Sequence, residues 1–221
     1  MTVLITGANR GIGLALATAY AKTGHEVIGT SRSHSPGQDA AITWHTLHVQ
    51  TPESQADLAK AVRGSPISLL VCNAGVFLDR GEALGDGFPT EQWADTFATN
   101  VTGVFLTVQS LLPNLRLAPS AKIAIIASKM GSTARAPGGS YIYRASKAAV
   151  VNLGRNLAAD LKADGIAVGI YHPGWVRTDM GGPAAAVSVE QSADGLAQRI
   201  DHLSMATTGC FEAFDGDALP Y

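Results

Sequence analysis

One helical stretch carries a tyrosine and a lysine at a spacing that suits proton transfer. Tyr143 lies four positions before Lys147 in GGSYIYRASKAAV, and Tyr141 lies six positions before it. A helix turns by about 100° per residue, so Tyr143 and Lys147 share a face while Tyr141 lies on the opposite side. An ammonium group near a phenol lowers the phenol pKa. We therefore predict a proton-transfer pair, although an i,i+4 pair by itself is common on helix surfaces.

Other residues follow predicted strands at positions that could join this pair. Ser128 ends the apolar run KIAIIAS, Asn73 follows SLLVC, and Gly174 follows IAVGIYHP. In an open parallel sheet, ligands bind beyond the carboxyl ends of the strands. We expect these residues and the Tyr143 face of the helix to border one crevice.

A glycine-rich turn follows the first predicted strand. The segment TGANRGIG opens a predicted helix, with Gly7, Gly11 and Gly13 at the spacing G-x-x-x-G-x-G. Glycines let the backbone approach a pyrophosphate, and the free N–H groups of the helix N-terminus bind phosphate. An ordinary strand–helix turn is the alternative, but the strand–turn–helix context favours a dinucleotide site.

Short apolar runs alternate with helical periodicity along the whole chain. We predict strands at residues 2–6, 26–31, 44–49, 67–75, 122–128, 166–174 and 209–216. Helix signals include Thr51 as a cap before Pro52, Ser188 with Gln191 at the capping-box spacing, and two consecutive helices between residues 90 and 115. This alternation predicts an α/β fold, a doubly wound parallel sheet (Rossmann fold) of about seven strands flanked by helices, in a single domain over residues 1–221.

Composition and charge argue against several classes of function. The net charge is −2 with no block of like charges, so a nucleic-acid-binding surface is not indicated. No apolar run reaches the roughly 20 residues that span a bilayer, and the first residues do not read as a signal peptide. Cys72 and Cys210 are far apart, which favours a reducing, cytoplasmic setting, and the scattered histidines indicate no metal site.

Taken together, these motifs resemble the short-chain dehydrogenase/reductase family. TGANRGIG matches its TGxxxGIG motif, CNAG its NNAG motif, YRASK its YxxxK motif and HPGWVRTDM its PGxVxT segment. Asn100 and Ser128 match the asparagine and serine of the family, and the final TTGCFEAFDGDALPY resembles the branch of C-factor and sniffer-like carbonyl reductases. There are three departures. Cys72 replaces the first asparagine of NNAG, and His48 stands where the family has an acidic residue that helps to hold the adenine. The chain is also shorter than usual between Met180 and Ser188, where the family often inserts helices over the substrate, so the resemblance implies a more open site.

The resemblance implies a role for each matching residue. Ser128 would bond the substrate carbonyl, and Tyr143 would donate the proton. Lys147 would lower the pKa of Tyr143 and hold the nicotinamide ribose, and Asn100 would support a water chain to Lys147. These four form the predicted catalytic set. The implied cofactor-binding residues are Gly7, Asn9, Arg10, Gly11, Ile12, Gly13, Ser31, Arg32, Asn73, Ala74, Gly75, Tyr143, Lys147, Pro173, Gly174, Val176 and Thr178.

The end of the second predicted strand bears on the choice between NAD(H) and NADP(H). NAD-preferring members of the family have an acidic residue there, whereas this chain has Ser31 followed by Arg32. A guanidinium group matches phosphate oxygens, and Arg10 could reach the same ribose from the other side. We predict a preference for NADP(H), with solvated surface arginines as the alternative.

The implied activity is the NADPH-dependent reduction of an aldehyde or ketone. We expect Met130, Thr133, Tyr141, Trp175 and the segment after Thr178 to line a pocket for a small hydrophobic carbonyl compound. We expect His172 to be a buried structural imidazole. Apolar helices around residues 100–115 and 140–162 predict a homodimer or homotetramer. The alternative is a dinucleotide-binding signalling protein of C-factor type with weak or incidental catalysis.

Overall fold

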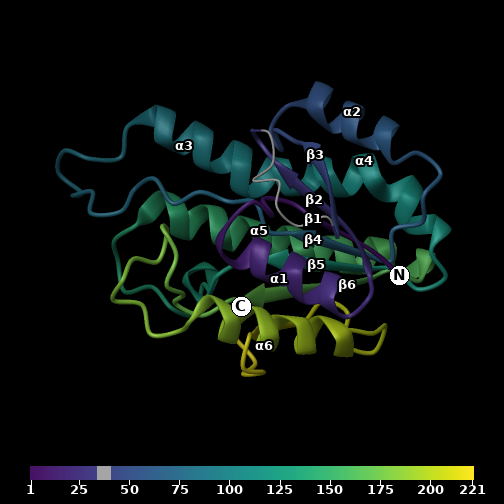
Figure 1. Cartoon of the computed structure of the whole chain (residues 1–221). Coiled ribbons are helices and arrows are strands. Elements are labelled where there is room, and N and C mark those ends of the chain that lie inside the picture. Colours follow the sequence, from purple (N-terminus) through teal and green to yellow (C-terminus); the bar gives the residue numbers. More distant parts are fainter. Residues whose placement is uncertain (34–40) are drawn as a thin grey trace.

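The computed structural model describes residues 1–33 and 41–221 of the chain. In this part of the chain, seven parallel strands form one sheet in the order β3-β2-β1-β4-β5-β6-β7, which confirms the predicted doubly wound fold (Figure 1). The strands are β1 (Thr2–Ile5), β2 (Glu26–Ser31), β3 (Ile42–Thr46), β4 (Leu69–Cys72), β5 (Lys122–Ile126), β6 (Ala167–His172) and β7 (Phe211–Ala213).

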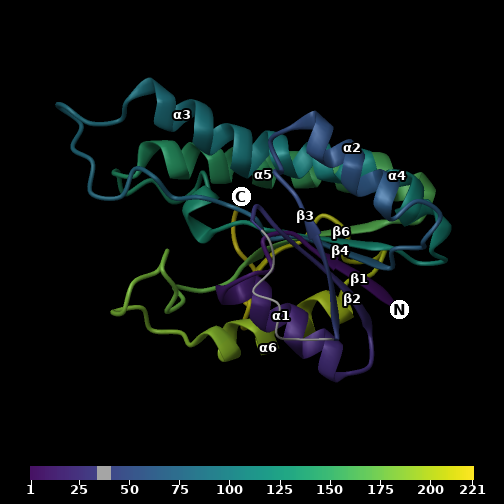
Figure 2. The ribbon, with the colours of Figure 1, turned by 45° about the horizontal axis from the view of Figure 1, so that its top comes forward.

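Helices cover both faces of the sheet (Figure 2). One face carries α1 (Gly11–Lys22) and α6 (Val189–His202), which pack against each other. This layering is the one that alternating strands and helices predict. The helices of the other face are α2 (Pro52–Ala61), α3 (Thr90–Phe97), α4 (Gly103–Leu117) and α5 (Tyr141–Asp160).

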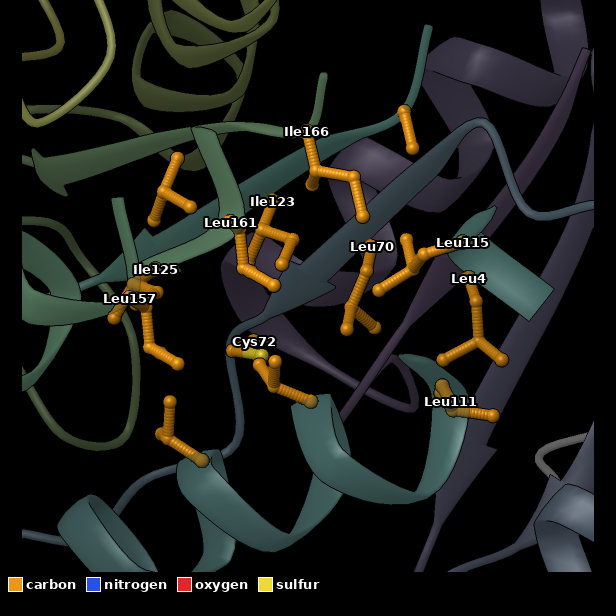
Figure 3. Close-up of a cluster of buried hydrophobic side chains, with 14 of the residues drawn as sticks. Leu4, Leu70, Cys72, Leu111, Leu115, Ile123, Ile125, Leu157, Leu161 and Ile166 are labelled. Carbon is orange, nitrogen blue, oxygen red and sulfur yellow. The ribbon is translucent and has the colours of Figure 1, made fainter. Parts of the chain in front are cut away.

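Each face of the sheet has its own hydrophobic core. Leu70 and Cys72 of β4 point into the core that also contains Leu111 of α4 (Figure 3). Leu69 and Val71 of the same strand belong to the core on the other face. Successive side chains of a strand point to opposite faces, so a continuous apolar run is buried on both sides. This explains why the strand reads as unbroken hydrophobic sequence.

The strand order reverses at β1, which lies between β2 and β4. Ile5 at the end of β1 pairs with Gly29 on one side and with Val71 on the other. The connections that leave these neighbouring strands diverge, and a crevice forms at their carboxyl ends. The turns after β1 and β4 border this crevice.

The third strand starts and ends earlier than predicted. β3 covers residues 42–46 rather than 44–49, because a turn follows it directly: the N–H and the hydroxyl of Thr51 both donate to the carbonyl of His48 at 3.0 Å. Thr51 therefore occupies the predicted N-cap position of α2, but its hydroxyl does not cap the helix. Ser188 and Gln191 do form the predicted capping box of α6.

The two helices expected between residues 90 and 115 are continuous with each other. α3 leads through a π-helical segment, η1 (Ala98–Thr102), into α4, and the junction residues Ala98 and Thr102 keep helical backbone angles. Single π-helical segments inside helices are rare and lie frequently at functional sites. Asn100 sits in the middle of η1 and is buried.

Within residues 1–33 and 41–221, no helix has the length and apolar character to cross a membrane. The same residues contain no group of three His, Cys, Asp or Glu side chains that could hold a metal ion. Cys72 and Cys210 are both free thiols.

Candidate active site

The turn between β1 and α1 depends on glycine. Gly7 and Gly11 have φ angles of 64° and 54°, a region that other residues rarely adopt. A Cβ atom on Gly13 would lie 2.4 Å from the carbonyl oxygen of Gly7 and 2.5 Å from Nδ2 of Asn73, so a larger residue does not fit. Asn73 Nδ2 donates to the carbonyls of Thr6 and Gly7, each at 3.0 Å. The glycine turn is thus tied to the turn that follows β4.

A cleft of about 620 Å³ opens at the carboxyl edge of the sheet, a size typical of cofactor and small-molecule sites. Gly174 and Val176 are not part of its wall. Val176 is buried, and a Cβ on Gly174 would meet the ring of Phe214 at 3.0 Å. The other predicted cofactor-binding residues do line it, namely Gly7, Asn9, Arg10, Gly11, Ile12, Gly13, Ser31, Arg32, Asn73, Ala74, Gly75, Tyr143, Lys147, Pro173 and Thr178.

The end of the cleft near β2 carries an arginine that is available to a ligand. Arg32 is exposed, and within the described part of the chain it has no ion-pair or hydrogen-bond partner. Ser31 beside it is buried. Leu47 and Val49 add apolar wall, whereas His48 between them is exposed and lies outside the wall. This part of the cleft therefore offers the adenine apolar side chains, Leu47 and Val49, instead of the acidic side chain that the family resemblance implies at position 48.

Arg10 differs from Arg32 because it already has a partner. Its Nη1 lies 2.6 Å from Oδ2 of Asp179, and both side chains are largely exposed. Arg80 donates to the carbonyl of the next residue, Met180. Residues 179 and 180 are thus held by two arginines from distant parts of the chain. The prediction that Arg10 flanks the adenosine ribose must compete with this ion pair.

Tyr143 and Lys147 lie on one face of α5, as their spacing predicts. Nζ of Lys147 is 5.6 Å from the centroid of the Tyr143 ring and donates to the carbonyl of Ile126 at 3.0 Å. Both side chains are buried, and burial lowers the pKa of Lys147 to about 8. Tyr141 is 38% exposed and meets the ring of Phe88 edge-on, away from the pair.

Ser128 lies near Tyr143 and Lys147 because the turn that follows it packs closely against the backbone of α5. The turn η2 (Lys129–Gly131) follows Ser128, and a Cβ on Gly131 would lie 2.5 Å from the carbonyl of Lys147. Only glycine allows the turn to approach the α5 backbone so closely. The Ser128 side chain is a hydrogen-bond partner that favours the ionised form of Tyr143.

The pKa of Tyr143 is raised to about 12. Burial is the main cause, while the hydrogen bond with Ser128 and the charge of Arg80 lower the pKa and the carboxylate of Asp79 raises it. This direction is opposite to the one that its spacing with Lys147 predicts, because removal from water is the largest effect on the phenol. The phenol is therefore protonated at neutral pH, which is the form that can donate a proton.

Asn100 links η1 to the segment after β4 and to α5. Its Oδ1 accepts from the N–H of Val76 at 2.8 Å, and its Nδ2 donates to the Val76 carbonyl at 2.9 Å and to the Ser146 hydroxyl at 3.1 Å. The Ser146 hydroxyl donates in turn to the carbonyl of Tyr143 at 2.8 Å. The Asn100 side chain thus holds backbone next to the predicted catalytic pair.

The residues predicted to line a substrate pocket fall into two groups. Asp179 and Met180, in the segment after Thr178, are part of the cleft wall, whereas Met130, Thr133, Tyr141 and Trp175 are not. Trp175 is 51% exposed, and its Nε1 donates to the carbonyl of Gly181 at 2.9 Å. The structure therefore does not gather Met130, Tyr141 and Trp175 around the cleft that holds Tyr143.

His172 at the end of β6 has the environment of a structural imidazole. It is buried, and its pKa is lowered to about 4, first by burial and then by the charge of Lys129, with Asp215 acting in the opposite direction. The ring is neutral at physiological pH.

Sequence reasoning missed a segment that contacts Tyr143 directly. The Phe77 ring stacks on the Tyr143 ring with centroids 4.2 Å apart, and the Arg80 guanidinium lies 5.0 Å from the Phe77 centroid. The carboxylate of Asp79 accepts a hydrogen bond from the backbone N–H of Tyr143. These residues match none of the motifs, and no local pattern signals a contact between positions so far apart in the chain.

The cleft has the features that a dinucleotide requires. Among the described residues, no side chain caps α1 at Arg10, and the first turn of α1 holds no acidic residue. The N–H groups at this helix start are therefore available to phosphate oxygens. Arg32 stands at one end of the cleft, and Tyr143 and Lys147 belong to the same wall. The site also lies where the strand order reverses, which is the usual place for such ligands.

Comparison with known proteins agrees with this geometry. A family model described as short chain dehydrogenase matches residues 1–187. The chain belongs to the short-chain dehydrogenase family. Among the curated members, C-signal of Myxococcus xanthus is 38% identical over 157 residues, which cover 71% of this chain and 93% of that protein.

Solved structures of carbonyl reductases resemble this short-chain dehydrogenase over its full length. The NADPH-bound carbonyl reductase from chicken fatty liver has a TM-score of 0.89 and 30% identity, covering 100% of this chain and 98% of that one. The carbonyl reductase Sniffer of D. melanogaster has a TM-score of 0.91 and 26% identity, covering 100% and 99%. Family and structural likeness together indicate an oxidoreductase with a nicotinamide dinucleotide cofactor.

Proposed function

We propose that this chain is an NADP(H)-dependent reductase that converts an aldehyde or ketone to an alcohol, with Tyr143 as the proton donor. The observation that carries the proposal is the buried pair of Tyr143 and Lys147 in the wall of a cleft that also contains the glycine turn. A pKa of about 12 keeps the proton on Tyr143 at neutral pH, as reduction requires. The likeness to an NADPH-bound carbonyl reductase supports the same reaction.

Four side chains share the chemistry in this proposal. Ser128 donates a hydrogen bond to the carbonyl oxygen of the substrate, and Tyr143 transfers its proton to that oxygen as negative charge develops. Lys147 holds the nicotinamide ribose, and Asn100 supports a water chain that returns a proton to Lys147. The bound reduced nicotinamide supplies the hydride, so that hydride and proton together convert the carbonyl to an alcohol.

The preference for NADP(H) over NAD(H) is part of the proposal. It is supported by the exposed Arg32 directly after β2, which has no partner among residues 1–33 and 41–221. The end of β2 itself carries Ser31 rather than an acidic side chain that would repel a 2′-phosphate. Arg10 contributes less, because its guanidinium is paired with Asp179. We further propose that residues 1–221 act as one catalytic domain. Two free thiols support a reducing compartment such as the cytoplasm as its location.

The substrate in this proposal is a small hydrophobic carbonyl compound. Phe77, stacked on Tyr143, and Met180 in the cleft wall offer apolar contacts near the phenol. Loss of NADPH absorbance with a panel of aldehydes and ketones tests the proposal. We expect saturable turnover with at least one apolar member of the panel. A protein that oxidises NADPH with none of them, although it binds NADPH, would refute it.

A second candidate function is supported by one observation, the 38% identity with C-signal. In that case the chain would bind a dinucleotide and act through a partner, with weak or incidental catalysis. Binding of NADPH without turnover of any carbonyl compound would favour this candidate over the reductase.

A further inference from the structure

The segment Val76–Arg80 shows an inverted pattern of exposure. Leu78 is 41% exposed, whereas the neighbouring Asp79 is 0% exposed. A buried carboxylate is costly unless hydrogen bonds and opposite charge compensate it. The buried carboxylate of Asp79 therefore requires hydrogen-bond donors, and the identity of these donors indicates the role of the residue.

The partner of Asp79 is the start of α5. Its Oδ2 accepts from the N–H of Ile142 at 2.8 Å, and the N–H of Tyr143 lies 3.2 Å from Oδ1 and 3.3 Å from Oδ2. Free N–H groups and a positive partial charge at a helix N-terminus compensate a carboxylate. Charge-assisted bonds of this kind are stronger than those between neutral groups.

α5 lacks a cap of its own. Within the described residues, the side chain of Ser140 makes no cap hydrogen bond, and its φ of 46° places it in the left-handed region. The first turn of α5 also contains no acidic residue. Asp79 supplies the missing cap from a position 63 residues before Ile142.

The cap acts on the residue that carries the proposed chemistry. One of the two N–H groups that Asp79 binds is the N–H of Tyr143 itself, and Phe77 from the same segment stacks on the phenol ring. Asn100 holds the beginning of the segment through both backbone groups of Val76. The position of Tyr143 therefore depends on a segment that is itself anchored.

We propose that Asp79 is a positioning residue for Tyr143, whose carboxylate caps α5 from outside the helix and so determines where the phenol lies. The proposal rests on the proposed function, because the reaction it serves is proton donation by Tyr143. It assigns a role to a residue outside the motifs of the chain.

The charges of Asp79 and Arg80 provide a way to distinguish a positioning role of Asp79 from a purely structural one, because they act on the pKa of Tyr143 in opposite directions. The groups that face the phenol are Asp79 and Arg80 from the segment after β4, Ser128 from the turn after β5, and Lys147 from α5 itself. Asp79 raises the pKa of Tyr143 and Arg80 lowers it. Removal of the two charges should thus shift the titration of Tyr143 in opposite directions.

The capping itself is tested by hydrogen–deuterium exchange on the full chain. We expect Asp79→Asn to speed exchange of the amides of Ile142 and Tyr143 by about tenfold, because they lose a charge-assisted acceptor. Asp164→Asn, which breaks a surface ion pair with Arg116, is the matched control and leaves these amides unchanged. Unchanged exchange in Asp79→Asn would overturn the proposal.

The effect on the reaction is tested by the pH profile of alcohol oxidation. We expect Asp79→Asn to lower kcat about tenfold and to move the rising limb to lower pH, and Arg80→Gln to move it to higher pH. If the rising limbs of the pH profiles of both variants coincide with that of the wild type, the proposal is overturned. A wild type without turnover would instead refute the proposed function, and the exchange measurement would then decide the role of Asp79. Arg80 is exposed, so its variant tests the shift even if Asp79→Asn does not fold.

Discussion

Burial determines the proton affinity of the two central side chains. It raises the pKa of Tyr143 to about 12 and lowers that of Lys147 to about 8. Both shifts favour the neutral form, as removal from water does for any ionisable group. A neutral phenol donates a proton, so the site is suited to reduction at neutral pH. A lysine with a lowered pKa can exchange protons with water near that pH.

Lys147 also makes a prediction about stability. Its pKa is lowered in the folded state, so the cost of the buried charge is full below pH 8 and disappears as pH rises from about 8 to 10.5. We expect Lys147→Met to raise the free energy of unfolding near pH 7, by on the order of 1–2 kcal/mol, and by less near pH 10. Urea unfolding at both pH values measures this. Lys60→Met, on exposed α2 surface, is the control, and equal destabilisation by Lys147→Met at both values would contradict the account.

The choice of cofactor is predicted to depend on Arg32. One charge-assisted hydrogen bond that only NADPH can make is worth about 1.5–3 kcal/mol, which implies a preference of at least roughly tenfold. We expect Arg32→Ala to remove most of this preference, measured as the ratio of kcat/KM for NADPH and NADH. Arg10→Ala should change the ratio less, because Arg10 is paired with Asp179. A wild type that uses NADH equally well would contradict the prediction.

At the scale of elements, the turns around the site pack so closely that only glycine, which has no side chain, fits at the contact points. Gly13 meets the carbonyl of Gly7 and the amide of Asn73, and Gly131 meets the backbone of α5 at Lys147. The first contact joins the glycine turn to the turn after β4, and the second joins the turn after β5 to α5. A Cβ atom at either position would separate them.

We predict that Gly13→Ala both destabilises the protein and weakens cofactor binding. The new Cβ would lie 2.4 Å from a backbone carbonyl, which can move only with the turn. Overpacking of this kind costs about 1–3 kcal/mol, and we expect the NADPH Kd to rise more than about tenfold. Thermal unfolding and fluorescence titration measure the two effects. Gly85→Ala, which meets no atom within 4 Å, should change neither, and a wild-type Kd in Gly13→Ala would refute the prediction.

The elements also show what sequence patterns can and cannot predict. Helical periodicity correctly separated the faces of Tyr143 and Tyr141, and apolar runs correctly located the strands, because both depend on local geometry. The end of β3 was placed too late, since a turn at His48 is not visible in the apolar pattern. Contacts between distant segments, such as the one from Asp79 to α5, have no local signature at all.

Electrostatics were the least predictable part of the site. Spacing alone indicated a lowered pKa for Tyr143, but the outcome depends on burial, which only the packed structure reveals. The ion pair of Arg10 with Asp179 joins residues 169 positions apart and likewise left no pattern. Charges therefore need the three-dimensional arrangement before their direction of effect can be assigned.

At the scale of the whole molecule, α3 and α4 keep several large apolar side chains exposed. Trp93 of α3 is 36% exposed, Phe105 of α4 is 41% exposed, and Leu117 at the end of α4 is 55% exposed. Exposed apolar surface of this kind marks interaction sites, and symmetric dimers are the commonest oligomers of soluble proteins. These helices belong to the layer that also contains α5 (Figure 2).

We therefore predict a homodimer or homotetramer that forms through this helical layer. Light scattering at micromolar concentration should give at least twice the mass of one chain. Phe105→Glu should lower the mass to that of a monomer, because burial of a charge in an apolar contact is unfavourable. Leu84→Glu, in the loop before α3, serves as the control and should keep the assembly. A monomeric wild type would rule out the prediction.

The comparison of two tyrosine variants tests the central claim most directly. Tyr143→Phe removes only the phenolic oxygen of the buried ring whose centroid lies 5.6 Å from Nζ of Lys147. Tyr141→Phe removes the phenolic oxygen of a residue that is 38% exposed on the other side of α5. With one carbonyl substrate and NADPH, we expect Tyr143→Phe to lower kcat by at least about a hundredfold while NADPH still binds, and Tyr141→Phe to keep most of the activity. Equal loss of kcat in both variants, or full activity in Tyr143→Phe, would contradict the assignment of Tyr143 as the proton donor.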